Sequence, residues 1–282
     1  MHEKLVTGLS RHQISTRIAR GEIVKQARGI HTWGEVDAQE LARILDQEWP
    51  DAVLDGESAL RQYLGLQLKF PLQLASRKQH AGGVKVQVRR LSRLEWWYVN
   101  GGRCVAPLTA LGSASEEAGR WFLNRYYAGF DGKRRLSQDL AGTKYMSKQT
   151  RALIDSVAIG ADSVPEREII TALKQAGLKV ESNYEIGGYR WDIVVKKHKV
   201  AVEIDGYGYH SLDKMEAFLK DHWKPNDAAA RGWTVFRYSG SCVKHHKDYV
   251  VRQILGQCEG TPFLPPPLWK WHKLFRPGGW RG

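Results

Sequence analysis

The stretch Tyr189–Val195, YRWDIVV, is followed after four residues by Val200–Ile204, VAVEI, and the two together decide the fold of the C-terminal part of the chain. Both runs are rich in β-branched and aromatic residues, which is typical of strands. The polar residues between them, Lys196–Lys199, suit a hairpin loop. We therefore expect two antiparallel strands, each carrying one carboxylate within an apolar run.

Those carboxylates are Asp192 and Glu203, and both occupy positions that structure alone does not explain. Burying an unpaired charge is costly, so an acidic residue in an apolar strand indicates a function. Antiparallel pairing across the hairpin brings Asp192 near Glu203, and the two-residue period of a strand puts Asp205 on the same face as Glu203. Converging carboxylates are the ligands of a hard divalent cation, so Asp192, Glu203 and Asp205 are the expected ligands of Mg²⁺ or Mn²⁺.

The flanking segments complete a small domain around this hairpin. Ser163–Glu166 has the pattern of a capping box and opens a helix that runs through Ala176. After the hairpin come a helical stretch containing Lys224 and then a turn into another strand over Gly232–Tyr238. The order helix, strand, strand, helix, strand predicts an α/β (α+β) fold with a mixed sheet flanked by helices.

This series of motifs resembles the Vsr-like branch of the PD-(D/E)XK nuclease superfamily over about 90 residues. The motifs are Ser-x-x-Glu, Trp-Asp, Glu-Ile-Asp-Gly-x-x-x-His, Asp-x-x-Lys and Gly-Trp-x-Val-x-Arg. The resemblance implies a metal-dependent endonuclease with catalytic Glu166, Asp192, Glu203, Asp205 and His210. In it, Glu166 orients metal or water, and His210 transfers a proton, which the ordinary pKa of histidine allows.

The chain departs from the wider superfamily at one position. Asp205 stands where most members have a water-orienting lysine, so His210, Lys220 or Lys224 is a candidate substitute. Simpler roles stay open beside the catalytic ones. Glu166 can serve only as a helix cap, Asp205 as a turn residue and His210 as a loop residue.

The composition favours nucleic acid as the partner. The chain of 282 residues has 43 Lys and Arg against 30 Asp and Glu, a formal net charge of +13, and 11 tryptophans. Positive charge attracts phosphates and indoles can stack on bases, so we expect double-stranded DNA as the partner, with RNA as an open alternative. No apolar run suits a membrane span, and three scattered cysteines indicate a reducing compartment, so a cytoplasmic location is expected.

Residues 1–34 are expected to form a winged helix-turn-helix. A helix capped by Ser10 precedes two short β-like runs that are hinged at Ala27-Arg28. The arrangement resembles the start of AbiEi-type antitoxins, and a solvated cap is the alternative. If the resemblance holds, the residues that face DNA are Arg11, His12, Arg17, Arg20, Lys25 and Arg28.

Three further regions complete the predicted organisation. Residues 35–150 form an α+β middle domain without a catalytic constellation, including helices over Val36–Glu48 and Glu57–Gly65 and a basic cluster over Arg125–Arg135. Residues 160–258 form the nuclease domain. Residues 259–282 form a proline-rich basic tail that either braces the protein or contacts DNA through Trp269 and Trp271.

Two functions of different classes fit these features. The first is a divalent-metal-dependent DNA endonuclease. Cleavage of both DNA strands would need two active sites, which suggests a homodimer. The second is a DNA-binding regulator, antitoxin-like at its N-terminus, whose nuclease fold is catalytically silent. The intact acidic set favours the enzyme, and the missing lysine favours the regulator.

Overall fold

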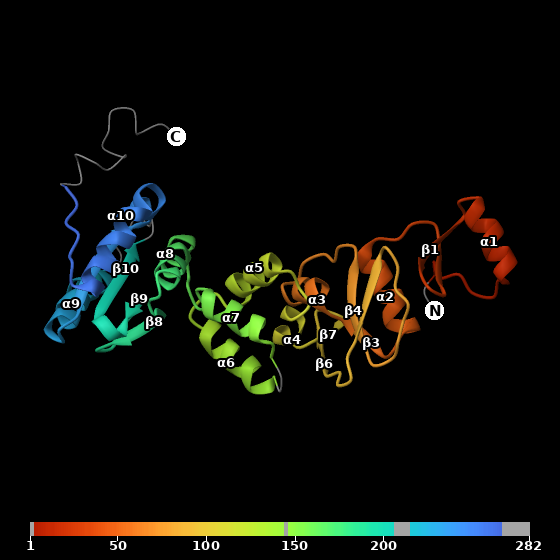
Figure 1. Cartoon of the computed structure of the whole chain (residues 1–282), viewed down its shortest axis with the longest axis horizontal. Coiled ribbons are helices and arrows are strands. Elements are labelled where there is room, and N and C mark those ends of the chain that lie inside the picture. The colour runs from red at the N-terminus through yellow and green to blue at the C-terminus, as the bar shows by residue number, and fades with distance from the viewer. Residues whose placement is uncertain (1–2, 144–145, 206–214, 267–282) are drawn as a thin grey trace, which may run out of the picture. The chain divides into compact units, whose positions relative to one another are not determined.

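The computed structural model describes residues 3–143, 146–205 and 215–266, and for 215–221 it describes the backbone. The chain divides into two compact units (Figure 1). The first contains Met1–Tyr126 and Arg135–Leu153, and the second contains Tyr127–Arg134 and Ile154–Gly282. Each unit has its own β-sheet and its own core, so each is described separately.

The first unit begins with a helix and a hairpin. Helix α1, Arg11–Ala19, starts at a capping box in which Ser10 and Gln13 bond each other's backbone N–H groups. Strands β1, Ile23–Ala27, and β2, Ile30–Trp33, pair antiparallel. The predicted helix and hairpin are confirmed, but the expected hinge at Ala27-Arg28 is wrong by one residue. The turn is Arg28-Gly29, because Gly29 takes the left-handed φ of +79° that the reversal needs.

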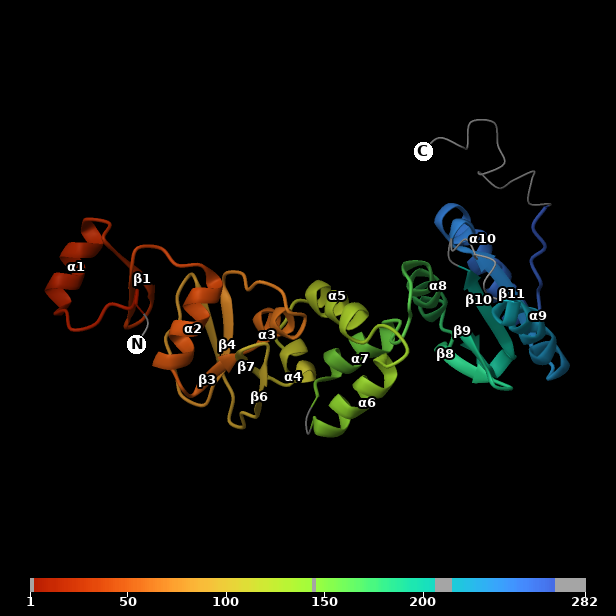
Figure 2. The same cartoon turned by 180° about the vertical axis from the view of Figure 1, so that it is seen from behind.

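A five-stranded sheet organises the rest of the first unit, in the order β5-β4-β3-β7-β6 (Figure 2). Its strands are β3 Ala52–Leu54, β4 Leu72–Ser76, β5 Val86–Arg90, β6 Trp96–Val99 and β7 Gly102–Val105. The helices are α2 Ala38–Glu48, α3 Gly56–Tyr63, α4 Pro107–Leu111 and α5 Glu116–Tyr126, while α6 Gly132–Gly142 and α7 Lys148–Ser156 cross the division between the units.

The predicted helices of the middle region are confirmed as α2 and α3. The first starts two residues later than expected because the side chain of Asp37 accepts the backbone N–H of Glu40, 2.7 Å away, and so caps the helix at Ala38. Leu41, Ile44 and Leu45 are buried on its apolar face, as their helical spacing predicts.

The second unit is built on a four-stranded sheet in the order β11-β10-β9-β8. Its elements are α8 Val164–Gln175, β8 Glu181–Ile186, β9 Tyr189–Val195, the short 3₁₀ turn Lys196–His198, β10 Val200–Asp205, α9 Met215–Ala230, β11 Thr234–Ser239 and α10 Gly240–Glu259. Strand β10 pairs antiparallel with β9 and parallel with β11, so the sheet is mixed, as predicted.

Two apolar clusters cover the two faces of this sheet. On one face, side chains of β9 and β10 such as Ile193 and Val202 pack with those of α8 and α10. On the other, Trp191, Val194 and Ala201 pack with Ala228 of α9. Helices therefore flank both faces, which confirms the predicted α/β (α+β) fold with mixed sheets flanked by helices.

Strand β8 and helix α10 were not expected from the sequence. Strand β8 pairs antiparallel with β9 through a turn at Gly187-Gly188, and both glycines have positive φ. The Gly-Gly pair is a hairpin signal, but the preceding run ESNYEI lacks the alternating pattern of a strand. Among the described residues, no helix is both long and apolar enough to cross a membrane.

Candidate active site

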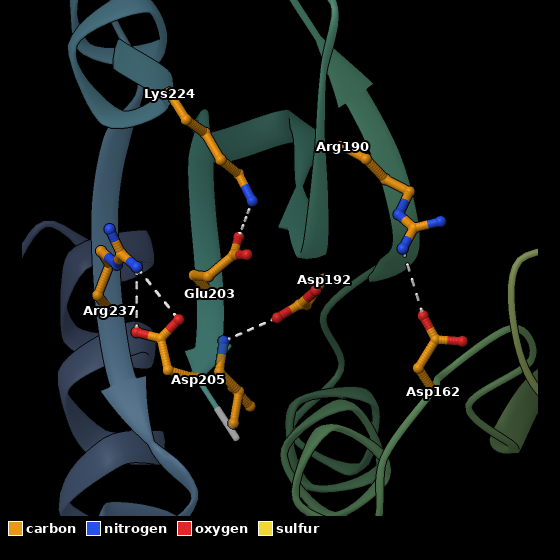
Figure 3. A network of polar contacts seen from close by, with 8 residues as sticks. Asp162, Arg190, Asp192, Glu203, Asp205, Lys224 and Arg237 are labelled. Carbon is orange, nitrogen blue, oxygen red and sulfur yellow. Dashed lines mark hydrogen bonds and ion pairs between the residues drawn. The ribbon is translucent and has the colours of Figure 1, made fainter. Parts of the chain in front are cut away.

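Asp192 lies where β9 separates from its neighbours. The pairing of β9 with β10 follows regular register to Ile193 opposite Val202 and stops there. One step further, Asp192 Oδ2 accepts the backbone N–H of Ile204 at 2.8 Å (Figure 3). The carboxylate thus replaces a backbone acceptor, and its position is fixed by the main chain of the neighbouring strand.

The other side of β9 is also interrupted at this residue. The ladder between β8 and β9 lacks a pair at Asn183 and Asp192, and Asn183 has a left-handed φ of +46°. Asn183 donates its side-chain N–H to the carbonyl of Gly160, which holds this conformation in place. As a result Trp191 and Ile193, two residues apart, contribute to opposite faces of the sheet.

Glu203 faces Asp192 from β10, and a lysine from another element contacts it. Nζ of Lys224, on α9, forms an ion pair with Glu203 Oε2 (Figure 3). The side chains of Lys224 and Glu203 are only 13% and 16% exposed, so this pair is well shielded from water. The ammonium group also lies 4.7 Å from the centre of the Trp191 ring.

Burial disfavours charge on both carboxylates, and neighbouring acids add to the effect. Burial, followed by the nearby Asp192, raises the pKa of Glu203 to about 7 despite the opposing effect of Lys224. Burial also raises the pKa of Asp192, against the hydrogen bond from Ile204 and the charge of Lys224. Two acids whose pKa values are raised beside each other form a site that a cation would stabilise.

Glu166 performs the capping role and also lies within electrostatic reach of the carboxylate pair. Its backbone N–H bonds Ser163 Oγ at 3.3 Å, and its carboxylate accepts the backbone N–H of Asp162 at 2.9 Å. The residue is 4% exposed, and burial raises its pKa, with a further increase from the charge of Asp192. Asp162 itself lies 3.8 Å from Arg190 (Figure 3).

Asp205 points to a different partner. Its carboxylate accepts two bonds from Arg237 of β11, at 3.1 and 3.2 Å, and is half exposed (Figure 3). The expected shared face with Glu203 is consistent with strand geometry, but the side chain is held toward β11 by Arg237. Among the described residues, no group of three potential metal ligands of the His, Cys, Asp and Glu types converges.

Several expected site residues lie outside the described residues. These are His210, Trp269 and Trp271, together with the side chain of Lys220. Sequence reasoning named Lys224 only as one of several substitutes for the missing lysine, and it did not identify Asp162, Asn183 or Arg237. Arg237 belongs to the quoted Gly-Trp-x-Val-x-Arg motif, which was the available signal.

The expected DNA-facing residues lie in the first unit. Arg11, His12, Lys25 and Arg28 are exposed on α1 and on the hairpin. Arg17, in contrast, pairs with Glu22 at 3.0 Å and lies 5.1 Å from the centre of the Trp33 ring, and Arg20 is 3.9 Å from Glu22. Between residues 3 and 34 the structure has one helix and one hairpin, and the winged helix-turn-helix stays a prediction.

The basic cluster at the end of α5 and the start of α6 is largely engaged within the protein. Lys133 donates to the carbonyl of Ser182, and Arg134 pairs with Asp131 at 3.0 Å. Arg135 donates to the carbonyl of Tyr126. Lys133 and Arg135 are therefore occupied by backbone carbonyls, whereas Arg134 stays largely exposed beside Asp131.

Two comparisons found similarity between parts of this chain and known nuclease domains. The family model REase_MTES_1575, of restriction endonuclease-like domains, matches residues 166–257. The solved catalytic domain of homing endonuclease I-Bth0305I is similar over 36% of this chain and 98% of that chain, with 21% identity and a TM-score of 0.30. No curated protein matches significantly. The matched segment contains Glu166, Asp192 and Glu203 and is similar to restriction endonuclease-like nuclease domains.

Proposed function

We propose that the chain is a divalent-metal-dependent endonuclease that hydrolyses phosphodiester bonds of double-stranded DNA. The observation that carries the proposal is the meeting of Asp192 and Glu203 at the point where β9 and β10 separate. Two shielded carboxylates beside one another carry more negative charge than the single ammonium group of Lys224 balances, which favours a further cation. A restriction endonuclease-like match over the same residues supports a nuclease function for this pair.

The donor set fits Mg²⁺ or Mn²⁺. Asp192 and Glu203 offer hard carboxylate oxygens, and two protein ligands leave room for water and phosphate oxygens. When bound, such a cation supplies a Lewis acid for the phosphate and lowers the pKa of water. Asp192 is oriented for this role by its bond to the Ile204 N–H, so the donor oxygens are placed before any ligand arrives.

In this proposal, Lys224 replaces the lysine that is missing from the strand. It reaches Glu203 from α9, and its ammonium group carries three donors. Once the carboxylate of Glu203 binds the metal ion, the three N–H donors of Lys224 are available. They would orient the attacking water and stabilise charge that develops on the phosphate. Glu166 supports the site through the Asp162 segment, and His210 is proposed as the proton-transfer residue on the basis of the sequence resemblance.

DNA is held, in this proposal, by the exposed basic side chains of the first unit. Arg11 and His12 lie on α1, and Lys25 and Arg28 lie on the following hairpin. Together they provide a basic surface that suits the phosphate backbone.

The proposal is tested by incubating the full chain with supercoiled plasmid and Mg²⁺. Asp192→Asn keeps an acceptor for the Ile204 N–H but removes the negative charge, so it should abolish nicking without unfolding the protein. Asp248→Asn, at an exposed position of α10, is the matched control and should cut normally. Cleavage by Asp192→Asn at the wild-type rate would overturn the site. Tight duplex binding by the wild type without cleavage in any divalent metal would favour the regulator instead.

A further inference from the structure

The first unit contains a cavity with an exposed tryptophan in its wall. The cavity has a volume of about 570 Å³, and its lining includes Trp97 of β6, Arg93 and Thr109. A second cavity of about 310 Å³ adjoins it, and Trp97, Ala106 and Gly142 line both. The proposed nuclease chemistry uses none of these residues, so the cavity needs its own account.

Trp97 and the adjacent Trp96 lie in different surroundings. Trp96 and Trp97 are 45% and 44% exposed, and they point to opposite faces of edge strand β6. Trp96 packs edge-on against Tyr98, with ring centres 6.0 Å apart, and Arg103 lies over its ring at 5.5 Å. Trp96 lines neither cavity, whereas Trp97 lines both.

The charge at this cavity suits an anionic ligand. The guanidinium of Arg93 is exposed and makes no hydrogen bond or ion pair with any described residue. Its segment is held in place, since Arg77 donates to the carbonyl of Leu94 at 3.2 Å. The lining contains two arginines and one acid, Glu95, and Arg89 already pairs with Asp55 at 2.8 Å, so Arg93 is the basic group of the described lining that remains for a ligand.

The wall also offers a hydrogen-bonding group for a ring edge. The hydroxyl of Thr109 has no side-chain partner among the described residues, whereas Ser147 and Thr150 bond each other at 2.9 Å. A flat ring stacked on Trp97 can therefore meet the Thr109 hydroxyl at its edge while an attached phosphate meets Arg93. A nucleobase joined through its sugar to a phosphate offers both features.

We propose that the Trp97 cavity receives an unstacked base of single-stranded DNA. Aromatic stacking supplies the base contact, and Arg93 supplies the contact to the strand's phosphate. The site belongs to the first unit and does not rest on the proposed endonuclease activity.

Binding without cleavage tests the site directly. The full chain carrying Asp192→Asn, in chelator, is titrated against fluorescein-labelled oligo(dT) and against a strand of the same length made of abasic sugar phosphates. Stacking of one base is worth roughly tenfold or more in affinity, so oligo(dT) should bind at least about tenfold tighter than the abasic strand. Trp97→Ala should erase that difference, Trp97→Phe should keep most of it, and Trp96→Ala should leave it unchanged.

Arg93 has a control of its own. Arg93→Gln should weaken binding of both strands and reduce the slope of log affinity against log salt by about 0.7, the value for one phosphate of a single strand. Arg90→Gln, an equally exposed position outside the cavity lining, should have little effect.

Four results would overturn the proposal. The first is equal binding of the oligo(dT) and abasic strands by the Asp192→Asn chain with Trp97 in place. The second is an equal loss in Trp96→Ala and Trp97→Ala, which would indicate a diffuse aromatic surface. The third is competition by free dTMP at the concentration of bases in the strand, which would indicate a mononucleotide pocket. The fourth is a Trp97→Ala effect on oligomeric state alone, which would indicate that a second copy covers β6. Because every arm is measured in Asp192→Asn, failure of the nuclease proposal leaves these results interpretable.

Discussion

The ammonium group of Lys224 contacts the carboxylate of Glu203, although the two residues are 21 positions apart in the sequence. Lys224 lies on helix α9 and Glu203 on strand β10. The contact is shielded from water, and it places a positive charge beside the carboxylates of Glu203 and Asp192. Its consequences for activity and metal binding can be separated by mutation.

Lys224→Ala should lower the rate of DNA cleavage about a hundredfold, because a positioned cationic donor stabilises charge in the transition state by roughly that factor. The same change should strengthen Mg²⁺ binding, since the ammonium group no longer competes for Glu203. Single-turnover nicking and a metal titration measure the two effects. Lys197→Ala, at an exposed position of the 3₁₀ turn, is the control. Loss of activity together with loss of metal binding would show that Lys224 is merely structural.

Mg²⁺ should stabilise the second unit through Asp192. At a concentration ten times its Kd, a ligand that binds only the folded state adds about 1.4 kcal/mol, which corresponds to a rise in Tm of roughly 3–6 °C. Thermal unfolding with and without Mg²⁺ measures this shift. It should vanish in Asp192→Asn and persist in Asp248→Asn. An undiminished shift in Asp192→Asn would place the metal elsewhere.

A hydrogen-bonded acid in the first unit should make its stability depend on pH. Burial by itself would raise the pKa of Asp51, but hydrogen bonds from Ser76 and His80, at 2.7 and 3.0 Å, outweigh it and lower the pKa to about 2. Because the folded-state pKa is depressed, the stabilisation is present above about pH 4 and is lost as the pH falls toward 2.

Asp51→Asn should therefore cost about 1 kcal/mol at neutral pH, a value reduced for partial solvent screening. Denaturant unfolding measures that difference, which should shrink between about pH 5 and about pH 2.5. Glu48→Gln, an exposed change in the same unit, should show no such trend. A constant difference across that range would mean that the bonds to Asp51 do not depend on its charge.

Basic side chains near the N-terminus should contribute less to duplex binding where they already pair with an acidic residue. Arg11→Gln combined with Arg28→Gln should weaken binding and reduce the slope of log affinity against log salt by about 2. Arg17→Gln should change the slope less, because that guanidinium already pairs with Glu22 at 3.0 Å. Equal slopes for the wild type and the double variant would exclude α1 and the hairpin from the DNA contact.

The sequence predicted those parts of the site that depend on neighbouring strands. Asp192 and Glu203 converge because a short hairpin joins their strands, and hairpin pairing follows from local pattern. The contact of Lys224 with Glu203 depends on the path of α9 across the sheet, which no local pattern encodes. The partner of Asp205 depends on the parallel pairing of β10 with β11, a non-local relationship of the same kind.

The fold could be predicted from the sequence to about the same extent as the site. Helices with clear caps, such as α2 and α8, lie within about two residues of their expected bounds. Strand β8, with its mixed polar sequence ESNYEI, lacks an alternating pattern and was missed. Its partly buried polar residues have partners only once β9 and the Gly160 segment are in place, as Asn183 shows.

The indole of Trp191 gives Lys224 a second anchor that does not depend on any carboxylate. The ring is 1% exposed and lies 4.7 Å from the ammonium group. When Glu203 is neutralised, by a proton or by a ligand, the electron-rich face of this ring still attracts the lysine. The ammonium group of Lys224 can therefore exchange one acceptor for another while it stays beside the Trp191 ring and away from solvent.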